Sequence, residues 1–96
     1  MMQKSHVRIP KKLMGKKLEG EWVFLNLENG HYYGLNETGS ILWDELKTKG
    51  ISGDAMGRLQ KIFGVDRRIL EKDVNRFLRD LKKEGLIETA SSVSQA

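Results

Sequence analysis

The sequence contains no cysteine, one proline, two histidines and no long apolar run, and each shortage narrows what the chain can do. Without cysteine it has no disulfides and no thiolate nucleophile, and most structural zinc sites are excluded. No apolar segment approaches the roughly 20 residues that cross a bilayer, and the N-terminal residues lack the apolar stretch of a signal peptide. We therefore expect a cytoplasmic protein that contacts no membrane.

Catalytic chemistry is equally hard to assemble from this sequence. His6 and His31 lie in separate segments, and neither has a second ligand at the spacing of a metal site. Asp44 and Glu45 are sequence neighbours and would point in different directions on a helix. The glycine-containing residues 30–39 lack the Lys-Ser/Thr pair of a phosphate loop. We expect no enzyme activity and no cofactor, and we interpret the chain as a binding module.

The length and composition predict a single small domain. Ninety-six residues can bury one modest core. The 39% hydrophobic and 31% charged residues are typical of a globular chain. We expect residues 1–88 to form one domain and residues 89–96 to be a disordered polar tail.

Strands are expected in the first third of the chain. Residues 7–9 precede the only proline, which favours extended geometry, and are expected to form the first strand. A basic connection follows, with a short extended piece around Leu18. Residues 21–28 are rich in aromatic and branched side chains, which favour a strand. Asn29-Gly30 predicts a type I′ turn, with residues 31–35 as the returning strand.

This turn also predicts how the hairpin pairs. With a two-residue loop, Leu27 lies opposite Tyr32 and Leu25 opposite Gly34. One face of the hairpin then carries Val23, Leu25, Leu27 and Tyr32, and the other carries Trp22, Phe24, Tyr33 and Leu35. Because both faces are apolar, we expect helices to cover one face and the N-terminal arm or an outside partner to cover the other.

Three helices are expected after the hairpin. Asn36, Ser52 and Asp66 are suited to cap their N-termini, and a glycine ends each helix. The buried faces are predicted to carry Ile41, Leu42, Trp43 and Leu46, then Met56, Leu59, Ile62 and Phe63, then Leu70, Val74, Phe77, Leu78 and Leu81. The predicted fold is α+β and winged helix-turn-helix-like, with a three-stranded antiparallel sheet followed by three helices.

Such a fold leaves several kinds of partner open. In a DNA-binding transcription regulator, residues 66–84 would form the recognition helix. Residues 37–96 carry 11 basic and 10 acidic side chains, however, and phosphate binding needs clustered positive charge. We therefore disfavour nucleic acid as the partner and keep DNA binding as the alternative. A third reading is a scaffold that dimerises through its free sheet edges, and we expect a monomer or a weak dimer.

Two segments resemble the PqqD family, the recognition elements of pathways that modify ribosomally made peptides. They are LNLENGHYYGLNETGSILWDEL (25–46) and FGVDRRILEKDVNRFLRDLKKEGLI (63–87), and the likeness runs from about residue 5 to 88. The resemblance implies a protein that binds the leader segment of a precursor peptide for a modifying enzyme, either a leader peptidase or a radical SAM protein. The hairpin turn lacks the proline of quinone-cofactor members, which favours the members associated with lasso peptides.

In that resemblance the leader adds as a strand to the third strand, beside the third helix. The implied peptide-binding residues are His31, Tyr32, Tyr33, Gly34, Leu35, Arg67, Leu70, Asp73, Val74, Arg76 and Phe77. Strand addition is also physically reasonable, because an edge strand exposes unpaired backbone groups to which a peptide can hydrogen-bond. The aromatic residues of the set could equally belong to the core. We expect a proline at Tyr33 to abolish binding by removing an edge donor.

Overall fold

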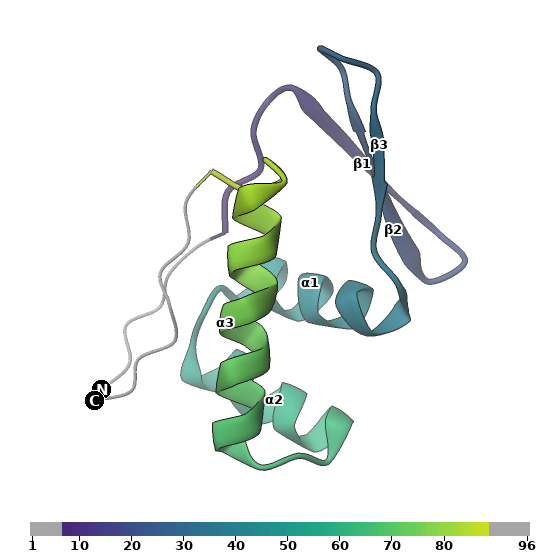
Figure 1. The fold of residues 1–96 in the computed structure, drawn as a ribbon. Helices are drawn as coiled ribbons and strands as arrows, with labels where there is room; N and C mark the ends of the chain where they lie inside the picture. Colours follow the sequence, from purple (N-terminus) through teal and green to yellow (C-terminus); the bar gives the residue numbers. More distant parts are fainter. Residues whose placement is uncertain (1–6, 89–96) are drawn as a thin grey trace.

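The structure, a computed structural model, describes residues 7–88, and this part of the chain forms three strands followed by three helices (Figure 1). The elements are β1 (Leu13–Leu18), β2 (Glu21–Asn26), β3 (Tyr32–Gly34), α1 (Glu37–Lys49), α2 (Gly53–Phe63) and α3 (Arg67–Lys83). The sheet is antiparallel with the order β1-β2-β3. The predicted α+β, winged helix-turn-helix-like fold is confirmed. The tail expected at residues 89–96 lies outside the described residues.

The three helices lie below and beside the sheet. Figure 1 shows the sheet above α1, with the long helix α3 standing beside it and α2 beneath. The end of β3 leads directly into α1, and residues of both elements line a cavity together with residues of α3. This arrangement leaves β1 and β3 as the two edge strands of the sheet.

Each helix begins at the predicted N-cap residue. Asn36 and Ser52 each accept a hydrogen bond from the backbone N–H three residues on, at 2.8 and 3.2 Å. Asp66 accepts one from the N–H two residues on, at 3.0 Å. A cap of this kind stabilises a helix by about 1 kcal/mol. The glycine predicted to end α3, Gly85, lies in a Schellman motif, with Leu86 N donating to Leu81 O at 2.9 Å.

The core lies between the helices and the inner face of the sheet. Phe24 of β2 meets Trp43 of α1 edge-on, with ring centroids 5.0 Å apart. Buried around them are Leu42, Leu46, Ala55, Met56, Leu59, Leu70, Val74, Leu78 and Leu81. One predicted core residue is wrong, because the Ile62 side chain is 48% exposed. It lies in the last turn of α2, where the half-buried residue facing the core is Phe63.

The first strand lies further along the chain than predicted. Residues 7–9 are outside the sheet, and there Arg8 O accepts a hydrogen bond from Glu88 N at 2.9 Å. The segment interpreted as a basic connection instead forms β1. Only Leu13 of its six residues is even half-buried, so its apolar pattern is weak and its pairing with β2 defines it. Lysines on such an edge strand discourage further pairing.

The type I′ turn occurs in the first hairpin and not in the second. Glu19 and Gly20 both have positive φ, 50° and 83°, between the paired residues Leu18 and Glu21. A left-handed conformation costs a residue other than glycine about 1 kcal/mol, so Glu19 gives no sequence signal for this turn.

The second hairpin has a four-residue loop, residues 27–30, and its register differs from the prediction by two residues. Tyr33 pairs with Phe24. The side-chain oxygen of Asn26 accepts hydrogen bonds from two loop N–H groups, at 2.9 and 3.3 Å, and this widens the turn. Because a shift of two residues keeps each side chain on its side of the sheet, the predicted faces hold.

The outer face of the sheet is uncovered in the described part of the chain. Tyr32 is 73% exposed there and Met14 57%. The N-terminal arm was expected as one possible cover. Its described part lies instead near the end of α3, where Arg8 O accepts a hydrogen bond from Glu88 N.

Candidate functional site

Two residues of β3 present their backbone groups away from the rest of the sheet. In an antiparallel pair, hydrogen-bonded and non-hydrogen-bonded positions alternate. Bonds to His31 O (2.9 Å) and from Leu35 N (2.8 Å) mark bonded positions, so His31, Tyr33 and Leu35 face β2. The N–H and C=O groups of Tyr32 and Gly34 therefore point outward, and within residues 7–88 no backbone partner is seen for them. The reason given for the effect of a proline at Tyr33 was wrong, because that N–H bonds to β2 and is not a donor of the open edge.

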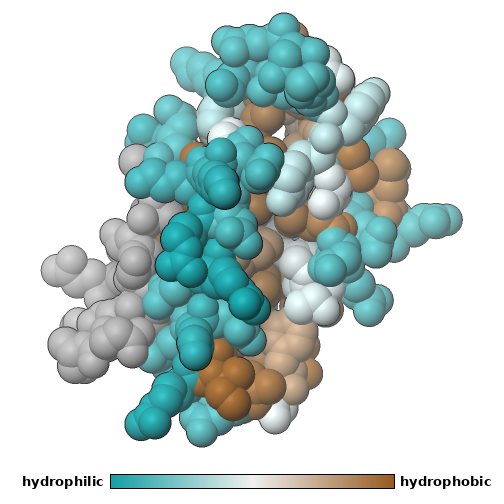
Figure 2. Space-filling view, in the orientation of Figure 1, coloured by the Kyte–Doolittle hydropathy of each residue, from teal (hydrophilic) through white to brown (hydrophobic). Residues whose placement is uncertain are grey.

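A groove runs alongside this open edge, between β3, the first turn of α1 and α3. We call it the β3–α3 groove, and its cavity has a volume of about 330 Å³. Leu42, Phe77 and Leu81 give it an apolar lining. Figure 2 shows brown and white surface between the teal outer face of α3 and the side of the molecule that carries β3 and the start of α1. The open edge thus lies next to a cavity large enough for side chains of an added strand.

Gly39 lies where the first turn of α1 meets α3 at the groove. A Cβ atom at Gly39 would lie 3.5 Å from Phe77 Cε1 and 3.3 Å from Asn36 Oδ1. A Cβ atom at this position would make an ordinary contact with the Phe77 ring and a tight one with the oxygen that caps α1.

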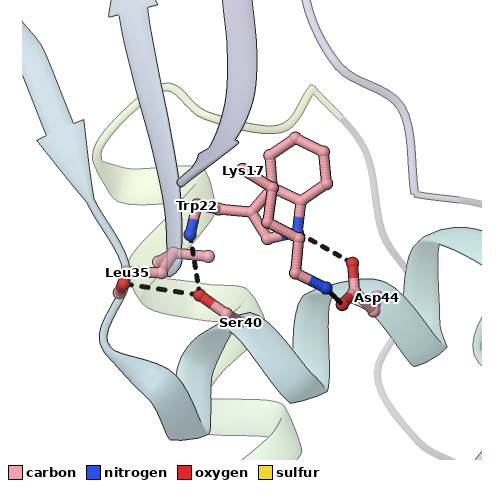
Figure 3. Close-up of polar contacts among 5 residues, drawn as sticks. All are labelled: Lys17, Trp22, Leu35, Ser40 and Asp44. Carbon is pink, nitrogen blue, oxygen red and sulfur yellow. Dashed lines mark hydrogen bonds and ion pairs between the residues drawn. The ribbon is translucent and has the colours of Figure 1, made fainter. Parts of the chain in front are cut away.

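A buried hydroxyl holds the end of β3 in place. Leu35 N donates to Trp22 O at 2.8 Å. Trp22 N, however, donates to Ser40 Oγ at 2.9 Å, and this hydroxyl donates to Leu35 O at 3.4 Å (Figure 3). In a regular ladder Trp22 and Leu35 would exchange both bonds directly. The hydroxyl of α1 replaces the second bond, so the chain can leave the sheet and begin α1 at a fixed point.

A second polar link joins the same helix to the other two strands. Asp44 of α1 accepts a hydrogen bond from Trp22 Nε1 at 2.8 Å and pairs with Lys17 of β1 (Figure 3). Together with Ser40, it anchors the sheet on α1. The open edge of β3 is therefore presented by a supported sheet.

Charged residues lie on the side of α3 that faces the groove. Asp73 and Arg76 form an exposed ion pair at 3.6 Å. Asp80 and Glu84 follow one and two turns further on, and both raise the pKa of Tyr33. Burial is the largest cause of that raised pKa, and the two negative charges add to it. The Tyr33 hydroxyl therefore stays protonated and can donate a hydrogen bond.

The groove brings together six of the eleven residues implied by the resemblance. They are Tyr33, Gly34, Leu35, Asp73, Arg76 and Phe77. The β3 residues follow each other along the open edge, and the α3 residues recur at helical spacing on one face.

The other five implied residues lie elsewhere. Leu70 and Val74 are buried in the core, at 2% and 0% exposure. Arg67 pairs with Glu71 at 3.2 Å near the start of α3, outside the groove lining. His31 is exposed beside the hairpin loop, and Tyr32 points to the outer face of the sheet. Tyr32 can therefore contribute through its backbone and not through the groove.

The sequence reasoning missed six residues of the groove lining. They are Asn36, Thr38, Gly39, Leu42, Asp80 and Leu81. Asp80 and Leu81 lie three and four residues after Phe77, so helical periodicity could have found them. The four residues from α1 and its cap gave no such signal, because their place depends on how α1 crosses α3.

The structure shows neither a metal site nor a membrane helix in the part it describes. Among residues 7–88, no group of three or more His, Cys, Asp or Glu side chains could hold a metal ion. Within the same range, no helix has the length and apolar character needed to cross a membrane.

The fold and the groove define a small winged-helix-like domain with an open strand edge beside its last helix. The family model described as coenzyme PQQ synthesis protein D (PqqD) matches residues 21–87, and the chain belongs to this family. A comparison with curated protein sequences gives no match.

Two solved structures are similar to this chain over nearly their whole length. One is described as TbiB1 in complex with the TbiA(beta) leader peptide, with 29% identity and a TM-score of 0.75, covering 88% of this chain and 98% of that chain. The other is described as lasso peptide synthetase B1 complexed with the leader peptide. Its identity is 23% and its TM-score 0.78, and it covers 88% of this chain and 100% of that chain, which shows a shared fold.

Proposed function

We propose that this protein binds the leader segment of a ribosomally made precursor peptide by strand addition to β3 and presents it to a modifying enzyme. The observation that carries the proposal is the open edge of Tyr32 and Gly34 beside the β3–α3 groove. The 29% identity to TbiB1, a protein solved with a leader peptide, supports it. Strand addition obtains affinity from main-chain hydrogen bonds and specificity from pockets for alternate side chains.

In this proposal each part of the site has a different task. The four outward backbone groups of Tyr32 and Gly34 bond the peptide main chain, whatever its sequence. Because side chains alternate along a strand, every second peptide residue then faces the apolar lining formed by Leu42, Phe77 and Leu81. These lining residues select the peptide, since they are the surface that an inward side chain meets.

The protein itself performs no chemistry in this proposal. The groove holds no pairing of nucleophile and base, and its polar residues suit orientation of a peptide. The partner enzyme is a leader peptidase or a radical SAM protein, and the hairpin without proline favours the peptidase of a lasso peptide pathway. Nothing in the fold comparisons favours the DNA-binding alternative.

The proposal is tested by titrating the TbiA(beta) leader peptide into ¹⁵N-labelled protein and following backbone amide shifts. We expect the large shifts at residues 32–36 and 73–81, where the open edge and the groove lie. Amide shifts confined to β1 or to the N-terminal arm would contradict the proposal. Duplex DNA in a gel-shift assay serves as the control ligand, and binding weakened by salt would favour the alternative.

A further inference from the structure

The charges along the β3–α3 groove are balanced at one end and unbalanced at the other. Near the start of α1, Asp73 is paired with Arg76 at 3.6 Å. Toward the end of α3, Asp80 and Glu84 have no cation within ion-pair distance in the described part of the chain. This end of the groove is negative, although the whole protein carries a net charge of +4.

The two unbalanced carboxylates lie close to the open edge. Asp80 lines the groove cavity together with Tyr33. Glu84 follows Asp80 by one helical turn, since its N–H donates to Asp80 O at 2.9 Å, and it lies just beyond the cavity lining. Burial is the largest cause of the raised pKa of Tyr33, the middle residue of β3, and both carboxylates add to it. A strand added to β3 passes directly in front of this residue. A peptide side chain that enters the groove there lies on the side of Asp80, with Glu84 one helical turn beyond.

We propose that the β3–α3 groove selects leader peptides with a lysine or arginine side chain opposite Asp80 and Glu84. This inference rests on the proposed function and names the class of leader that the site accepts. A cation there gains two attractive partners, and an Asp or Glu meets two repulsive ones. Because the carboxylates are exposed, each pair has a modest effect, so we expect a preference of about three- to tenfold over a neutral residue.

The test is a selection from a library of random 14-residue peptides displayed on yeast. Wild-type protein should enrich peptides with Lys or Arg at one fixed distance from an apolar residue. The double variant Asp80→Lys with Glu84→Lys should enrich Asp or Glu at the same position. Lysines near the C-terminus of α3 suit the helix dipole, so this variant is expected to fold.

A matched control separates a local effect from a change in net charge. The double variant Glu21→Lys with Asp54→Lys alters the net charge equally at exposed positions outside the groove, and should keep the wild-type preference. The variant Thr38→Trp, which fills the groove, defines which enriched peptides depend on it.

The outcomes distinguish this inference from the proposed function. Some enriched peptides will depend on the groove, since they are no longer enriched with the Thr38→Trp variant. If these peptides show no charge preference with either the wild type or the Asp80/Glu84 variant, the inference is overturned and peptide binding remains. No enrichment that depends on the groove would overturn the proposed function, and the inference with it.

Discussion

Replacing Tyr32 with proline is expected to weaken peptide binding about tenfold or more and to leave the fold intact. The Tyr32 N–H points away from β2, so proline removes a donor from the open edge without breaking the sheet. It stands first in β3, a position that tolerates proline. A backbone hydrogen bond contributes about 1 kcal/mol, and the ring adds a steric obstacle at the edge. Isothermal titration of the leader peptide measures the loss.

The matched control for this variant is Tyr32→Ala. It removes the exposed side chain and keeps the backbone N–H, so its affinity should stay near that of the wild type. Circular dichroism should show the same fold for both variants. If Tyr32→Pro folds and binds as well as Tyr32→Ala, the open edge is not where the peptide docks.

Replacing Thr38 with tryptophan should reduce peptide binding by about tenfold or more, because the indole fills the groove and keeps a peptide side chain out of its pocket. Thr38 is exposed, lies in the first turn of α1 and lines the cavity of about 330 Å³. Because the side chain is outside the core, the free energy of unfolding should change by less than about 0.5 kcal/mol. Fluorescence anisotropy of a labelled peptide and urea unfolding measure the two quantities.

Glu37→Trp is the control for the filled groove. Glu37 is the neighbouring exposed residue of the same helix turn, and it does not line the cavity. Its replacement should leave affinity unchanged. Equal affinities for the Thr38 and Glu37 variants would show that peptide side chains do not enter the groove.

The helices could be predicted from the sequence because local chemistry fixes their ends. Asn36, Ser52 and Asp66 each satisfy a free N–H of the first turn, and this requires only residues two or three positions away. The apolar spacing along α3 likewise predicted its buried face, and Phe77 of this face lines the groove. Helix ends and buried helix faces can therefore be predicted without knowledge of the rest of the fold.

The bounds and register of the sheet could not be predicted in the same way, because they depend on competing local hydrogen bonds and on pairing between strands. Asn29-Gly30 is a strong turn signal, yet the side chain of Asn26 bonds the loop and moves the register by two residues. The first turn uses Glu19 at positive φ, against its preference. The pairing of β1 with β2 then stabilises a strand whose own sequence is weakly apolar.

The groove depends on packing between elements that sequence spacing does not reveal. The first turn of α1 meets α3 where Gly39 lies next to Phe77. Ser40, a small polar residue within a helix, replaces a ladder bond and fixes where β3 ends. Its role follows from three elements meeting at one hydroxyl.

Amide hydrogen exchange at β3, with and without a saturating bound peptide, tests the central claim most directly. Tyr33 N–H bonds to β2 in the free protein, so it should exchange slowly in both states. The N–H groups of Tyr32 and Gly34 should exchange rapidly in the free protein and become strongly protected in the complex. Unchanged rapid exchange at both residues in the complex would contradict strand addition at this edge.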